Sequence, residues 1–127
     1  MSAIPTQNLT AEIEAFLERE SSAQTYEDKV ALGRDVLAWA RETYGAGLTI
    51  ASSMGDEILL HLAGSTAPGF DVFFLDTGYH FAETLGTRDA YEVMLPLKIR
   101  TVHPRESVER QDVRFGPRLH ARNPDLC

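Results

Sequence analysis

The chain has 127 residues, of which 43% are hydrophobic and 24% charged, the proportions of an ordinary globular protein. This length is enough for one modest hydrophobic core. The sequence contains no run of 18 or more apolar residues, so no membrane span is predicted. The net charge is −7, but residues 98–127 hold 7 bases against 4 acids. The acidic body argues against nucleic-acid binding, and the basic tail suits either a small anionic ligand or a solvated surface.

The N-terminal stretch predicts a helical segment over residues 1–47 that carries no chemistry. Residues 1–9 are expected to be loosely docked. The N-terminus has no basic region followed by an apolar stretch, so no secretion signal is predicted. Thr10 is expected to cap a helix that reaches residue 20, and Thr25 a second helix that ends at Gly45. Because the single cysteine, Cys127, cannot form an intrachain disulfide, we expect a cytoplasmic protein.

Residues 48–127 predict an α/β core with parallel strands. Short apolar runs alternate with helix-like segments, and the connections are long enough for right-handed helical crossovers. Consecutive apolar residues in the second strand predict a strand that is covered on both faces. The expected strands cover residues 48–52, 71–75 and 98–102, and the expected helices cover residues 54–63 and 83–94.

Two hydroxyls and a glycine follow the first predicted strand. Ser52, Ser53 and Gly55 lead into a helix, whose free N–H groups can bind an anion. The alternative is a helix that is simply capped by Ser53. Because Asp56 and Glu57 would repel phosphate, we expect both side chains to face away from such a ligand.

The loop after the second strand combines several side chains that are common in functional sites. Gly78 permits positive φ, and the aromatic rings of Tyr79, His80 and Phe81 can stack on a flat ligand. The alternative is a turn in which Asp76 bonds local N–H groups and the aromatic residues pack as core. The sequence alone leaves both interpretations open.

The remaining polar residues give weaker signals. The histidines lack the spacing of a metal site, so no zinc site is expected, and His80 is the one inside a candidate site. Four arginines recur at every fourth position, but Gly116 and Pro117 interrupt the stretch, which favours a solvated face over a basic stripe. These arginines are Arg110, Arg114, Arg118 and Arg122.

Three stretches together resemble the assimilatory sulfonucleotide reductases, which act on adenylyl sulfate or phosphoadenylyl sulfate: SSMGDEILLHLA, DVFFLDTGYHFAETLGTRDA and LHARNPDLC. The resemblance covers residues 48–127. It implies a doubly wound, mainly parallel α/β sheet of the adenine-nucleotide alpha-hydrolase-like (PP-loop) type, incomplete at its C-terminus. It places Ser52 and Ser53 at the phosphosulfate end and the second loop at the adenosine pocket. The implied substrate-binding residues are Ser52, Ser53, Gly55, Leu75, Asp76, Thr77 and Gly78.

Cys127 resembles the first cysteine of the pair that holds a [4Fe–4S] cluster in the adenylyl-sulfate branch. Such a cluster needs four thiolates, and this chain supplies one. The nucleophilic cysteine of the family has no counterpart here, so we interpret the chain as an N-terminal half and predict that residues 1–127 release no sulfite. The resemblance implies thioredoxin or a similar dithiol as partner, and exposed apolar surface predicts self-association, including homo-oligomers.

Three alternatives stay open. The first is the phosphoadenylyl-sulfate reductase subtype. The second is a PP-loop adenylyl transferase, which Met54 argues against because those enzymes place a glycine-rich loop there. The third is a non-catalytic nucleotide-binding module, which the reading frame beyond Cys127 would distinguish from a reductase.

Overall fold

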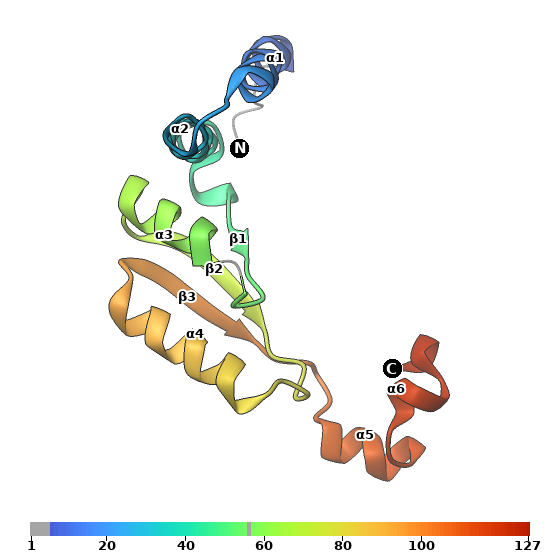
Figure 1. Cartoon of the computed structure of the whole chain (residues 1–127). Helices are drawn as coiled ribbons and strands as arrows, with labels where there is room; N and C mark the ends of the chain where they lie inside the picture. The colour runs from blue at the N-terminus through green and yellow to red at the C-terminus, as the bar shows by residue number, and fades with distance from the viewer. Residues whose placement is uncertain (1–5, 56) are drawn as a thin grey trace.

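The computed structural model describes residues 6–55 and 57–127. Figure 1 shows three parts in a row: a hairpin of α1 and α2 at one end, a sheet with α3 and α4 in the middle, and α5 and α6 at the other end. We call residues 103–127 the C-terminal arm. The elements in chain order are α1 Thr6–Ser22, α2 Tyr26–Tyr44, η1 Gly45–Gly47, β1 Ile50–Ala51, α3 Glu57–Thr66, β2 Phe70–Leu75, α4 Ala82–Met94, β3 Leu97–Val102, α5 Val108–Phe115, α6 Leu119–Arg122 and η2 Pro124–Leu126.

The sheet confirms the predicted α/β class with parallel strands. Its order is β1-β2-β3, with Ile50 beside Val72 and Phe70 beside Leu97. Each described strand therefore neighbours the next one in the chain, and the reversal of strand order that marks a doubly wound sheet does not occur among these three. This sequential order brings the loops that follow β1, β2 and β3 to one edge of the sheet.

The core lies on one face of the sheet. Phe70, Val72 and Phe74 alternate along β2 and are almost fully buried, together with Leu60 of α3. The prediction that β2 is covered on both faces is wrong, because the residues between them are only half-buried and Leu75 is exposed. The physical reason is that no described element covers the second face. On that face Asp71 forms a bidentate ion pair with Arg100, at 2.8–2.9 Å.

The N-terminal hairpin corrects one boundary and confirms another. Thr25 caps α2, as predicted, and in addition forms a capping box with Asp28. Thr10 does not cap a helix, because α1 already begins at Thr6 and no glycine or proline interrupts it. Of residues 1–9, which were expected to be loosely docked, residues 1–5 lie outside the described part, and residues 6–9 form the first turn of α1. Trp39 joins the two helices by donating a hydrogen bond to Glu12 over 2.6 Å.

The arm breaks the series of arginines. Gly116, with φ of 85°, ends α5, and Arg118 adopts a left-handed φ of 55° before α6 begins. Arg122 then turns back and donates to the carbonyl oxygens of Phe115 and Pro117. The four arginines therefore do not form one stripe. None of the helices in the described residues is both long and apolar enough to cross a membrane.

Candidate functional site

The loop after β1, residues 52–55, is held tightly to the core. The Ser52 N–H donates to the Phe73 carbonyl at 3.0 Å, which extends the ladder between β1 and β2. The Ser52 hydroxyl accepts from the Met54 N–H at 3.0 Å, and both residues are only 6% exposed. Met54 adopts a φ of 62°, a conformation that favours glycine, and its buried side chain anchors the loop in the core. Ser53 and Gly55 are left exposed.

This geometry excludes the interpretation of Ser53 as a helix cap. An N-cap must be followed by helical residues, and the left-handed Met54 directly after Ser53 excludes that role. The Ser53 side chain is thus available on the surface. The predicted orientation of Asp56 and Glu57 falls on side chains outside the described part of the structure.

The loop after β2, residues 76–81, is an ordered turn. The Asp76 N–H donates to the Val102 carbonyl at 2.9 Å, so the turn starts from the β2–β3 ladder. One Asp76 oxygen accepts from the Gly78 N–H at 3.0 Å, and Gly78 has a φ of 83°. The Thr77 hydroxyl accepts from the Tyr79 N–H at 3.4 Å. For Asp76, the local-turn interpretation is therefore the one observed.

The second oxygen of Asp76 faces two basic side chains. Arg88 Nη1 of α4 lies 3.8 Å away and His103 Nδ1 lies 3.9 Å away, and the Asp76 side chain is only 17% exposed. Arg88 also sits over the ring of Phe74, 5.7 Å from its centroid. Asp76 therefore connects the ends of β2 and β3 with α4, and its carboxylate is occupied by protein contacts.

The aromatic residues of this loop do not pack together as core. Tyr79 is 44% and Phe81 78% exposed, so that alternative is wrong for both. His80 Nε2 lies 2.8 Å from the Leu75 carbonyl oxygen, and its ring lies 4.8 Å from that of Phe74. His80 therefore closes the turn back onto the last residue of β2.

The two loops meet at one cavity, which we call the interloop cavity. Its volume is about 430 Å³. It contains residues from both predicted loops, which confirms that Ser53 and Thr77 lie together. Of the seven predicted binding residues, Gly55, Asp76 and Gly78 are not among its lining residues. The lining consists of Ala51, Ser52, Ser53, Phe73, Phe74, Leu75, Thr77 and His80.

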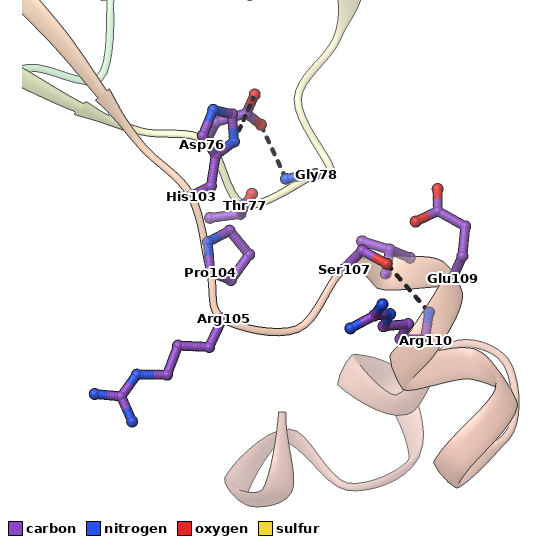
Figure 2. A pocket seen from close by; sticks show the side chains of 10 residues that line it. Asp76, Thr77, Gly78, His103, Pro104, Arg105, Ser107, Glu109 and Arg110 are labelled. Carbon is purple, nitrogen blue, oxygen red and sulfur yellow. Dashed lines mark hydrogen bonds and ion pairs between the residues drawn. The ribbon is translucent and has the colours of Figure 1, made fainter.

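A second cavity of about 330 Å³ is lined by the β2 loop and the C-terminal arm. Figure 2 shows Asp76, Thr77 and Gly78 facing the segment that leads into α5, where Ser107 accepts a hydrogen bond from the Arg110 N–H. This segment is not among the sites predicted from the sequence. The third parallel strand ends at Val102, so the polar residues after it had to reach the same edge of the sheet. The arm residues that line this second cavity are His103, Pro104, Arg105, Ser107, Val108, Glu109 and Arg110.

A third cavity of about 660 Å³ brings Cys127 near Thr77. The exposed Cys127 Sγ accepts from Gln111 Nε2 at 3.3 Å, and the Tyr79 ring lies 5.0 Å from that of His120. Burial, together with the negative charges of Cys127 and Asp112, raises the pKa of Tyr79. The described residues contain no group of three or more potential metal ligands, so this chain does not by itself fit a [4Fe–4S] cluster.

Comparison with known proteins identifies relatives of this chain. An adenosine 5'-phosphosulfate reductase from Streptomyces coelicolor is 46% identical over the whole chain, which covers 52% of that relative. One from Mycolicibacterium smegmatis is 44% identical over 76% of the chain and 41% of its own length. The chain thus spans about half the length of the curated relatives that it matches.

A solved structure agrees with these relatives. The phosphoadenylyl-sulfate (PAPS) reductase from Candida auris, in a phosphate complex, matches with a TM-score of 0.60 and 28% identity, over 74% of this chain and 47% of the other. The family described as the phosphoadenosine phosphosulfate reductase domain matches residues 47–127, the part that holds the sheet, both loops and the arm. The chain therefore belongs to the phosphoadenosine phosphosulfate reductase domain family.

Proposed function

We propose that this chain is the nucleotide-binding part of a thioredoxin-dependent reductase that converts adenylyl sulfate to sulfite and AMP in sulfate assimilation. The observation that carries the proposal is the interloop cavity, which joins Ser52 and Ser53 to Leu75 and Thr77 at the carboxyl edge of a parallel sheet. The names of the similar bacterial proteins support the choice of adenylyl sulfate. The single cysteine supports a cytoplasmic location.

The proposed subsites follow the two loops. Ser53 offers an exposed hydroxyl to the phosphosulfate, and Ser52 holds the loop in shape through Met54. Leu75, Thr77 and Gly78 contact the adenosine. Asp76 contributes indirectly, because its carboxylate fixes the Gly78 N–H and faces Arg88. Gly55 is proposed as part of the phosphosulfate loop beside Ser53, where a Cβ would make only an ordinary contact, 3.6 Å from the Ser53 hydroxyl.

The chemical step requires a nucleophilic thiolate that residues 1–127 do not supply. In this proposal that thiolate attacks the sulfur of adenylyl sulfate, the S–O bond to phosphate breaks, and AMP leaves. A dithiol such as thioredoxin then attacks the enzyme S-sulfonate, releases sulfite and becomes a disulfide. Cys127 is proposed as one thiolate ligand of a [4Fe–4S] cluster whose other ligands lie outside these residues.

Phosphoadenylyl sulfate is the second candidate substrate, because the matched solved structure is a reductase of that nucleotide. Calorimetric titration of the chain with AMP and with adenosine 3',5'-bisphosphate distinguishes the two. We expect AMP to bind at least about tenfold more tightly, a difference of about 1.4 kcal/mol. Tighter binding of the bisphosphate would reverse the choice of substrate, and binding of neither would contradict the proposed nucleotide site.

Variants locate the site within the same titration. Ser53→Ala and Thr77→Val each remove one hydroxyl from the interloop cavity and should weaken AMP binding several-fold. Ser65→Ala is the matched control, because this exposed hydroxyl of α3 bonds the Leu62 carbonyl and does not line the interloop cavity. Equal affinity in all three variants would contradict binding at the interloop cavity.

A further inference from the structure

The interloop cavity contains one side chain that can become a cation. Seven of its eight lining residues are apolar or carry hydroxyl groups, and the eighth is His80. Adenylyl sulfate carries negative charge on both its phosphoryl and its sulfuryl group. A dianion placed between Ser53 and His80 would therefore find hydroxyl donors, and imidazole as the only lining group able to supply positive charge.

The contacts of His80 fix where that charge would appear. A carbonyl oxygen only accepts, so the Nε2 atom that lies 2.8 Å from the Leu75 oxygen carries a proton. The Phe74 ring, itself fully buried, lies 4.8 Å from the imidazole and supports it. Nδ1 has no hydrogen-bond partner within the described residues. A second proton on the ring therefore goes to Nδ1, without breaking the bond to Leu75.

The charged groups around His80 are paired with one another and do not bind its imidazole. Arg88 of α4 lies across the Phe74 ring, where it faces Asp76 and bonds Asp89. Asp76, in the same loop as His80, faces Arg88 and His103. These charges are engaged with one another, and neither Arg88 nor Asp76 lines the interloop cavity. No carboxylate within the described residues forms an ion pair with His80.

We propose that His80 is an anion-binding residue of the interloop cavity, whose imidazolium form contacts the phosphosulfate of the nucleotide through Nδ1. The inference rests on the proposed function and adds to it a proton that is taken up with the ligand. His80 also positions the β2 loop through Leu75 in either protonation state. Affinity for the dianion therefore rises as the pH falls through the range in which histidine gains its proton.

The test is calorimetric titration with adenylyl sulfate between about pH 5.5 and pH 8. AMP is unsuitable, because its phosphate itself titrates near pH 6. Wild type should bind about tenfold more tightly at the acid end than at the alkaline end. His80→Gln keeps a donor for the Leu75 carbonyl but cannot be protonated, so its affinity should stay flat with pH. His61→Gln, on α3 beside Tyr91, is the control and should behave as wild type.

The outcomes separate the inference from the proposed function. Binding with the same pH slope in wild type and His80→Gln overturns the role of His80 and leaves the nucleotide site standing. Absence of binding at every pH overturns both. If His80→Gln does not fold, an NMR pH titration of the His80 ring in wild type replaces it. The ring must then hold its proton to higher pH with adenylyl sulfate bound, and an unchanged titration curve overturns the inference.

Discussion

The sheet and the C-terminal arm hold the candidate site in different ways. The loops after β1 and β2 continue the backbone ladder and rest on buried side chains such as Met54 and Phe74. The arm follows β3 through a single segment, and it meets the β2 loop through side chains, with Val108 against Gly78 and His120 beside Tyr79. The interloop cavity is therefore determined by the core, whereas the two cavities that include the arm depend on a few side-chain contacts.

The largest expected difference comes from removing one phenylalanine from each region. Phe74→Ala empties a fully buried position under both His80 and Arg88 and should cost about 3–5 kcal/mol of unfolding free energy. Phe115→Ala removes a half-buried ring of the arm and should cost about 1 kcal/mol. Urea denaturation followed by circular dichroism measures both. Equal costs would contradict the division into a core and a dependent arm.

Gly78→Ala tests the contact between the two regions. A Cβ at Gly78 would lie 2.7 Å from Val108 Cγ2, and its φ of 83° adds backbone strain of about 1–2 kcal/mol. We expect lower stability and at least tenfold weaker AMP binding. Val108→Ala in the same chain should recover part of the affinity, since it removes the methyl group that clashes.

Gly86→Ala is the control for this prediction. Gly86 lies within α4 and has open space where a Cβ would be, so alanine should stabilise the helix by about 0.5–1 kcal/mol. If Gly78→Ala were as well tolerated as Gly86→Ala, in stability and in AMP affinity, the loop and the arm would not be in contact.

The sequence predicts the elements well where local signals and packing agree. The helix cap at Thr25, the strand at residues 98–102 and the stop at Gly116 agree with the prediction within a residue or two, because caps and breaking residues act locally. The pairing of the two loops also followed from consecutive parallel strands. The predicted helix start at Thr10 is wrong because residues 6–9 already form helix before it. A good capping residue does not mark the start of a helix that the preceding residues can form.

The sequence does not reveal features that depend on distant contacts. The left-handed Met54 has no local signature, because a buried side chain in the core holds it there. The sequence likewise does not show that only one face of β2 is fully covered, because its run of apolar residues is compatible with packing on one face or on both. The end of β3 at Val102 places His103 at the edge of the sheet, but the side-chain contacts through which the arm lines the second cavity depend on tertiary structure.

The smallest expected effect is on the open face of the sheet. Arg100 holds the pKa of Asp71 at about 2, below its usual 3.8, through two hydrogen bonds. A lowered pKa stabilises the folded protein above pH 3.8, and this contribution is lost as the pH falls through about 2. Asp71→Asn should therefore lower the urea midpoint slightly at neutral pH, and the gap to wild type should close in acid. A gap that widened in acid would contradict the ion pair.

The most direct test of the central claim is an NMR titration with adenylyl sulfate that follows every assigned backbone amide. The claim is that the loops after β1 and β2 bind one nucleotide together. We predict that the amides of Ser53 and Thr77 shift along the same saturation curve, while those of the α1–α2 hairpin stay fixed. Shifts confined to one of the two loops, or two different curves, would contradict a shared site.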